Sequence, residues 1–234
     1  ARIIQTSSDE GNVVLDPFCG CGTAVVAAEA ANRKWIGIDI THLAIALIKN
    51  RLTRDSNKDR KPFRIIGIPK DVKSAEALAI QNRHQFEWWA VGLVGGRPAQ
   101  DKRKGADRGV DGYIYFFDDG SGKAKKIVIQ VKSGSVSSDM IRDLRGTMER
   151  EKAVIAAFIT LKPPTRDMRK EAASSGIYQP EFYPQFRYNR IQVLTIEELL
   201  AGKILEYPRV APDPTFGRKR PPRRKGGSKT MLLV

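Results

Sequence analysis

The chain has 234 residues and a mass of 26.1 kDa, a length that suits one large domain or two small ones. Its 41 Lys and Arg residues outnumber its 26 Asp and Glu residues, and the net charge of +15 points to a polyanionic partner, above all nucleic acid. A hydrophobic fraction of 41% excludes general disorder, and no apolar run reaches the ~18 residues that a membrane-spanning helix needs.

The positive charge is spread unevenly along the chain. Residues 1–55 carry six basic and six acidic side chains, residues 56–208 carry 27 and 19, and the last 26 residues carry eight and one. Residues 56–79 are predicted to be a linker and residues 209–234 a basic, flexible tail. We therefore expect a neutral front segment over 1–55 and a second, basic domain over 80–208.

Hydrophobic periodicity predicts an α/β pattern in both segments. In the front segment we expect strand 13–16, helix 22–31, strand 35–39 and helix 41–52. Farther along the chain we expect helix 73–94, a hairpin of strands 110–117 and 126–132, helix 138–150, strand 153–160, helix 165–175, strand 191–195 and helix 196–202.

The first strand leads into a glycine turn typical of a nucleoside site. Gly20 and Gly22 let the backbone approach a ligand, whereas Val25 stands where a dinucleotide fingerprint needs a third glycine. Asp39, at the end of the next strand, is placed to accept hydrogen bonds from ribose hydroxyls. The pattern favours a nucleoside such as S-adenosylmethionine; a plain strand–helix turn is the alternative.

Two strings resemble the cofactor motif of circularly permuted DNA amino-methyltransferases, Asp16-Pro-Phe-Cys-Gly-Cys-Gly-Thr23 and Gly37-Ile-Asp-Ile40. Residues 2–8 look like the end of the helix that precedes this motif. The resemblance implies a partial Rossmann-like unit that binds S-adenosylmethionine. It also implies that the methionine end of the cofactor lies among Asp16, Phe18, Gly20 and Gly22 and that Asp39 holds the ribose.

The catalytic tetrapeptide of that family, an Asp, Asn or Ser followed by Pro-Pro and an aromatic residue, is absent. The nearest string, Asp213-Pro-Thr-Phe216, lacks the second proline. In permuted members the tetrapeptide precedes the cofactor motif. We therefore expect the chain, which begins with Ala1, to be part of a longer protein and not to methylate DNA by itself.

Cys19 and Cys21 are too close in sequence for an ordinary disulfide and suggest a reducing cytoplasm. Two thiols with no second pair or nearby histidine seldom form a metal site, so we expect small packing residues in the turn.

The hairpin carries a second constellation. On the return strand Ile127, Ile129 and Val131 share one face, whereas Gln130 and Lys132 share the other, and Asp111 lies on the partner strand. A carboxylate and an amide oxygen suit Mg²⁺ or Mn²⁺, and a lysine beside them suits phosphodiester hydrolysis. The alternative is a solvated hairpin face with a surface ion pair between Asp111 and Lys132.

The order of motifs resembles the Mrr-like branch of the PD-(D/E)xK nucleases over roughly residues 80–202. The resemblance is carried by Gln85-Phe-Glu87-Trp-Trp, Gly109-Val-Asp111-Gly112, Gln130-Val-Lys132 and the strand–helix–strand order that follows. It implies an α/β domain with a mixed central sheet flanked by helices. Asp111 would be the chief metal ligand, Gln130 the second-position ligand and Lys132 the catalytic lysine. Glu87, on the first helix, would face the site or else be a helix-surface acid.

Several basic residues are candidates for contact with DNA phosphates. They are Lys102, Arg103, Lys104, Arg108, Arg142 and Arg145 in the domain and Arg218, Lys219, Arg220, Arg223, Arg224 and Lys225 in the tail. Trp88 and Trp89 are expected to pack the first helix into the core, with base stacking as the alternative.

The sequence thus predicts a prokaryotic, cytoplasmic protein of the restriction–modification type that cleaves double-stranded DNA in a metal-dependent reaction. Two alternatives stay open: a methyltransferase fragment whose nuclease-like domain only binds DNA, and a module in which bound S-adenosylmethionine gates the nuclease. Whether the chain forms a homodimer also stays open.

Overall fold

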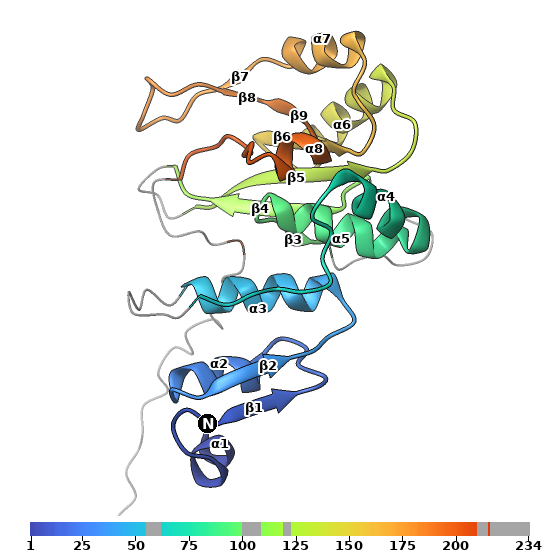
Figure 1. Cartoon of the computed structure of the whole chain (residues 1–234). Helices are drawn as coiled ribbons and strands as arrows, with labels where there is room; N and C mark the ends of the chain where they lie inside the picture. Colours follow the sequence, from blue (N-terminus) through green and yellow to red (C-terminus); the bar gives the residue numbers. More distant parts are fainter. Residues whose placement is uncertain (55–61, 100–108, 119–122, 210–214, 216–234) are drawn as a thin grey trace, which may run out of the picture.

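The computed structural model describes residues 1–54, 62–99, 109–118, 123–209 and 215. It contains a small two-stranded sheet near the N-terminus, a five-stranded sheet that forms the centre of the larger part, and a short two-stranded ribbon (Figure 1). None of the helices in the described residues is long and apolar enough to cross a membrane.

The N-terminal part is a βαβ unit with a helix on either side of it in the sequence. Its elements are α1 (Arg2–Ser7), β1 (Val13–Asp16), α2 (Thr23–Ala30), β2 (Lys34–Gly37) and α3 (His42–Arg54). The two strands are parallel, with Asp16 opposite Gly37. Val25, Ile48 and Leu52 form a small core on one side of this sheet. On the other side Val13, Leu15 and Ile36 remain exposed.

The larger sheet has the order β3-β4-β5-β6-β9 and is mixed. Strand β4 runs antiparallel to its neighbours β3 and β5, whereas β6 and β9 run parallel to β5. Its strands are β3 (Arg97–Pro98), β4 (Gly112–Phe116), β5 (Lys125–Lys132), β6 (Ile155–Thr160) and β9 (Ile191–Thr195), and the separate ribbon is β7 (Ile177–Tyr178) with β8 (Tyr188–Asn189). The sequence prediction of a mixed central sheet in an α/β protein is confirmed.

Helices cover both faces of this sheet (Figure 1). They are α4 (Val72–Gln81), α5 (Arg83–Leu93), α6 (Ser138–Arg150), α7 (Arg166–Ser174) and α8 (Ile196–Leu200). Helices α4, α5 and α8 pack on the face that carries Ile127, Ile129 and Val131. Helices α6 and α7 pack on the face that carries Val128, where Ile141, Leu144 and Met148 recur at helical spacing.

One predicted helix is divided in the structure. We expected a continuous helix over 73–94, but Asn82 is extended, with φ −157° and ψ 98°, and separates α4 from α5. The Asn82 side chain accepts a hydrogen bond from the backbone N–H of Gln85 and so caps the second helix. Helix α4 lies largely inside the stretch expected to be a linker, and its Ala75 is fully buried in the main core.

Candidate functional site

The carboxylate of Asp111 lies against the Gln130-Val131-Lys132 segment of β5. Its Oδ2 atom accepts a hydrogen bond of 2.8 Å from the backbone N–H of Val131, and its backbone N–H donates to the Ile129 carbonyl at 2.8 Å. The structure thus brings together the three residues that the sequence singled out in the hairpin. The register of β4 and β5 ends with Gly112 opposite Ile129, and Asp111, which precedes β4, departs from the regular ladder by donating its backbone N–H to that same Ile129.

Gln130 is a buried amide with an unused acceptor. The residue is 7% exposed, and its Oε1 atom is buried and has no hydrogen-bond partner among the described residues. Gly109 and Thr147 adjoin it: a Cβ atom at Gly109 would lie 3.4 Å from Gln130 Nε2 and 3.6 Å from Thr147 Oγ1. Buried acceptors are normally satisfied, so this oxygen is a position at which a bound water or ion would be stabilised.

Lys132 lies at the end of β5, two residues beyond Gln130 and on the same face. Its ammonium group forms no hydrogen bond or ion pair with the described residues. The ion pair between Asp111 and Lys132 that we considered as the alternative is therefore not formed in the described part of the chain. A positive charge next to a carboxylate and a buried amide can attract a phosphate group.

Glu87 takes part in a separate ion-pair cluster. It is only 5% exposed, so it is not the helix-surface acid that we considered. Its Oε1 lies 3.1 Å from Arg83 Nε and its Oε2 lies 3.3 Å from His84 Nδ1, all on α5. Helix α5 packs on the face of the sheet opposite to Gln130. Within the described residues, His, Cys, Asp and Glu side chains form no group of three or more that could hold a metal ion.

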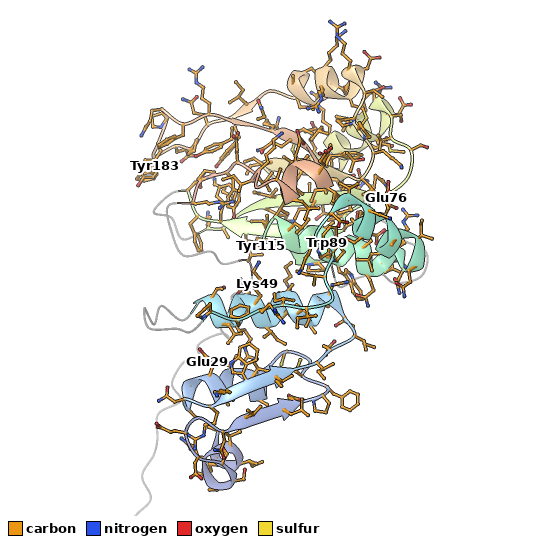
Figure 2. All side chains as sticks on the ribbon, in the orientation of Figure 1. Glu29, Lys49, Glu76, Trp89, Tyr115 and Tyr183 are labelled. Carbon is orange, nitrogen blue, oxygen red and sulfur yellow. The ribbon has the colours of Figure 1, made fainter. Side chains whose placement is uncertain are left out.

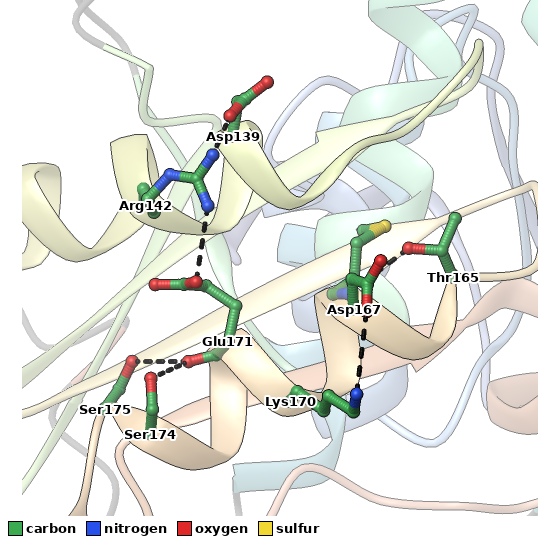
Figure 3. Close-up of polar contacts among 9 residues, drawn as sticks. Asp139, Arg142, Thr165, Asp167, Lys170, Glu171, Ser174 and Ser175 are labelled. Carbon is green, nitrogen blue, oxygen red and sulfur yellow. Dashed lines mark hydrogen bonds and ion pairs between the residues drawn. The ribbon is translucent and has the colours of Figure 1, made fainter.

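Two of the arginines predicted to contact DNA phosphates form ion pairs with acidic side chains. Arg142 pairs with Asp139 on its own helix and with Glu171 on α7 at 3.4 Å (Figure 3). Arg145 pairs with Glu149 at 3.8 Å. The other basic candidates lie outside the described residues, namely Lys102, Arg103, Lys104, Arg108, Arg218, Lys219, Arg220, Arg223, Arg224 and Lys225.

In the N-terminal part, Asp39 closes the glycine turn. Its Oδ2 accepts a 2.9 Å hydrogen bond from the backbone N–H of Gly20, and its Oδ1 accepts bonds from the backbone N–H and the hydroxyl of Thr41 at 2.9 and 2.8 Å. Partial burial opposes ionisation, but these hydrogen bonds outweigh it and lower the pKa of Asp39. The predicted ribose-binding acid is therefore a fixed carboxylate two residues beyond the end of β2.

The two glycines of the turn have different surroundings. A Cβ atom at Gly20 would meet nothing closer than 4.0 Å, so the backbone there is open to a ligand. Gly22 has a φ of +75°, and a Cβ atom there would lie 2.5 Å from Ile48 Cγ1. Gly22 is thus needed for close packing of the turn against α3, a role that the motif alone did not indicate.

The remaining predicted cofactor residues lie around the same turn. The backbone N–H of Phe18 donates to Asp16 Oδ1 at 3.3 Å, and the Phe18 side chain is 88% exposed. A cavity of about 600 Å³ is lined by Asp39 and by residues of β2, α3 and the segment 63–68, but Asp16, Phe18, Gly20 and Gly22 do not line it. Cys19 is buried in the small core and Cys21 is exposed; both are free thiols.

Comparison with known proteins identifies a methylase-like segment at the N-terminus. Residues 1–50 match the family model described as DNA methylase. Over 60 residues the chain is 48% identical to the type II methyltransferase M.BamHI of Bacillus amyloliquefaciens, covering 26% of the chain and 14% of that protein. Over 51 residues it is 47% identical to the DNA adenine methyltransferase YhdJ of Escherichia coli, covering 22% of the chain and 17% of that protein. The chain thus spans less than a fifth of either relative.

The larger part of the chain is restriction endonuclease-like. One solved structure, MspJI restriction endonuclease in complex with a 27-mer oligonucleotide, aligns with a TM-score of 0.37 and 16% identity over 67% of the chain and 39% of that protein. The family model described as NACHT-associated inactive Restriction Endonuclease 1 matches residues 83–201, which is half of the chain. The chain therefore belongs to the family of NACHT-associated inactive Restriction Endonuclease 1 domains.

Proposed function

We propose that the chain is part of a restriction–modification-type protein and that its larger domain hydrolyses phosphodiester bonds of double-stranded DNA. In this proposal the domain is an Mrr-like member of the PD-(D/E)xK nucleases. The observation that carries it is the contact of the Asp111 carboxylate with the backbone N–H of Val131, between Gln130 and Lys132. The contact supports the proposal because it joins Asp111 to the segment of β5 that carries Gln130 and Lys132, the other two side chains expected to act on a phosphate.

The residues present fit a hard divalent cation. Asp111 offers a carboxylate, and Gln130 offers a buried amide oxygen that no described residue uses. Mg²⁺ is commonly held by one or two protein oxygens together with waters and phosphate oxygens. When bound, Mg²⁺ or Mn²⁺ would supply Lewis-acid polarisation of the phosphate. Lys132 would orient the attacking water and offset the negative charge that develops on the pentavalent phosphorus as one bridging P–O bond breaks.

A plasmid-nicking assay with added Mg²⁺ or Mn²⁺ tests the proposal. Asp111→Asn preserves an acceptor for the Val131 N–H, and Lys132→Met preserves side-chain length, so both variants are expected to fold. Each should lower the nicking rate ~100-fold or more. Lys73→Met, which removes an exposed lysine from α4, is the matched control and should cleave at the wild-type rate. Equal cleavage by the wild type and Asp111→Asn would overturn the proposal.

A second candidate is a domain that binds DNA without cleaving it. The family to which the chain belongs is described as inactive, and Glu87 is paired with Arg83 and His84 on α5. Under this proposal the three side chains at β5 contact a phosphate but do not hydrolyse it. DNA binding by the wild-type chain in a gel-shift assay, together with no nicking in the presence of either Mg²⁺ or Mn²⁺, would favour this candidate.

For residues 1–55 we propose the C-terminal cofactor-binding portion of a circularly permuted DNA amino-methyltransferase. The open backbone at Gly20, the fixed carboxylate of Asp39 and the adjoining cavity of about 600 Å³ fit an adenosyl group. S-adenosylmethionine, when bound, supplies the methyl group. Because the chain spans less than a fifth of the methyltransferase relatives described above, methyl transfer by this chain alone is not part of the proposal.

A further inference from the structure

The loop between β7 and β8 carries a dense group of exposed aromatic side chains. Phe182 is 63% exposed, Tyr183 38% and Phe186 50%, and every residue from 181 to 187 is exposed. Figure 2 shows Tyr183 in this loop, which projects from the larger domain. Apolar groups that gather on the surface of a soluble protein mark an interaction site, because they add nothing to its core.

Two of these rings line a groove between the ribbon and residues 204–209. The groove has a volume of about 480 Å³, and Tyr183, Phe186 and Tyr188 line it together with Tyr207. We call it the aromatic groove. It shares no lining residue with the cavity at Asp39.

The walls of the aromatic groove are anchored to the core of the domain. The ring of Phe116, a residue that is buried, has its centroid 6.1 Å from that of Tyr178 in the ribbon and 5.5 Å from that of Tyr207. Within the loop, the backbone N–H of Phe186 donates to the Tyr183 carbonyl at 3.0 Å and closes a turn. The rings are therefore held in position before a partner arrives, which lowers the entropic cost of binding.

The rim of the aromatic groove is positively charged. Arg187 and Arg209 are exposed and line the groove, and Glu206 is the acid among the described residues that line it. The Arg187 guanidinium forms no hydrogen bond or ion pair with the described residues. Arg209 lies 4.8 Å from the ring centroid of Tyr207. Partial burial and the Glu206 carboxylate raise the pKa of Tyr188, so this phenol stays neutral and does not oppose an anion.

We propose that the aromatic groove binds a single strand of DNA, whose bases stack on Tyr183 and Phe186 and whose phosphates contact Arg187 and Arg209. Aromatic rings beside basic side chains are the combination that holds single-stranded nucleic acid. A duplex does not fit this chemistry, because its bases already stack on one another. In taking DNA as the source of the strand, the inference rests on the proposed function.

The aromatic groove is separate from the residues proposed to cleave DNA. Phe116, which packs on both of its walls, lies opposite Lys125 at the start of β5, whereas Lys132 is the last residue of that strand. Seven residues at about 3.3 Å each put roughly 23 Å between the two ends of β5. The groove is thus a second DNA contact outside the proposed cleavage site.

Fluorescence anisotropy with a labelled 12-mer of thymidines tests the proposal on the full chain, in EDTA so that no DNA is cleaved. Tyr183→Leu and Phe186→Leu remove a ring without changing the charge, and each should weaken binding of the strand at least about fivefold. Tyr183→Phe and Phe186→Tyr keep the ring and should bind as the wild type does. Ile177→Ala, which removes an exposed apolar side chain at the start of β7, is the matched control and should also bind normally.

The arginine contact has its own measurement. Arg187→Gln should weaken binding and reduce the slope of log Kd against log salt concentration by about 0.7, the value for one phosphate contact on a single strand. Lys73→Gln, which removes one exposed positive charge from α4, is the control and should leave that slope unchanged. The rings and Arg187 are exposed, so these variants are expected to fold, and circular dichroism checks that they do.

Four outcomes would overturn the proposal. They are equal binding of the strand by the wild type and both leucine variants, an equal loss of binding to a 12-base-pair duplex, tighter binding of a 12-mer of uridines than of thymidines, and loss of strand binding in Asp111→Asn. The last result would assign the strand to the residues at β5. Ring-dependent binding by a chain that does not nick plasmid would refute the proposed cleavage and leave the aromatic groove standing.

Discussion

Two buried glutamines in the same sheet should respond to one substitution with opposite signs. Gln130 on β5 is 7% exposed and leaves its Oε1 atom without a partner among the described residues. Gln192 on β9 is 8% exposed and fully used: its Nε2 donates to the carbonyls of Asn189 and Glu206 at 3.2 and 2.7 Å, and its Oε1 accepts from the Glu206 N–H at 2.9 Å. Methionine has nearly the same shape as glutamine but no polar amide.

The expected magnitudes follow from these contacts. Leaving a buried acceptor unpaired costs about 1–3 kcal/mol, so Gln130→Met removes a penalty and should raise the free energy of unfolding by about 1 kcal/mol. Gln192→Met deletes three hydrogen bonds and orphans their backbone partners, which should lower the free energy of unfolding by about 2–4 kcal/mol. For a protein of this size the melting temperature should rise by roughly 2–4 °C in the first variant and fall by roughly 4 °C or more in the second.

Denaturant unfolding monitored by circular dichroism provides the measurement. A Gln130→Met variant destabilised as much as Gln192→Met would refute the reasoning, because it would mean that the Gln130 amide is satisfied in solution. Repeating the titration with Mg²⁺ adds a functional readout. A ligand that binds only the folded state stabilises it, so Mg²⁺ should raise the stability of the wild type and not that of Gln130→Met.

Two further predictions concern the N-terminal part. Gly22→Ala should lower the free energy of unfolding by about 2–4 kcal/mol, because the new Cβ atom clashes with Ile48 and the residue has a left-handed backbone. Gly20 also has a left-handed backbone but no close neighbour, so Gly20→Ala should lower the free energy of unfolding by only about 1–2 kcal/mol. Equal losses in the two alanine variants would contradict the packing role of Gly22. Burial lowers the pKa of His42. Between that lowered pKa and the unfolded value of about 6.5, the unfolded chain binds a proton that the folded chain does not bind. The free energy of unfolding should therefore fall as the pH drops through this range. His42→Gln should show a shallower fall between about pH 7 and 5, and an identical pH profile would exclude this explanation.

The hairpin and the helices around it follow from the sequence because their signals are local. Alternation along residues 126–132 correctly separates the face of Ile127 and Ile129 from that of Gln130, and helix 138–150 has the predicted bounds. The strand–turn–helix around Gly20 also follows from the turn residues and the short apolar run before them.

What the sequence did not reveal depends on contacts between distant residues. The helical periodicity of residues 73–94 continues across Asn82, so the break appears only once the asparagine caps a new helix. A glycine at position 22 of the motif is expected both where the backbone approaches a ligand and where it packs closely against another element. Only the position of Ile48 in the fold distinguishes these two roles. The burial of Glu87 could not be predicted either. Its spacing to Arg83 and His84 on α5 shows that these side chains can pair, but not whether the pair is buried.

The side chain of Gln85 forms hydrogen bonds across the boundary between the two parts of the chain. This residue of α5 accepts a hydrogen bond from the backbone N–H of His42, the first residue of α3, at 2.9 Å and donates to the Ile40 carbonyl at 3.3 Å. The nuclease-like domain thus completes the start of a helix in the methylase-like segment, immediately after the carboxylate of Asp39. Separating the two segments at residues 55–61 would leave the start of α3 without the hydrogen bonds from Gln85, so the methylase-like segment depends on the nuclease-like domain for part of its local structure.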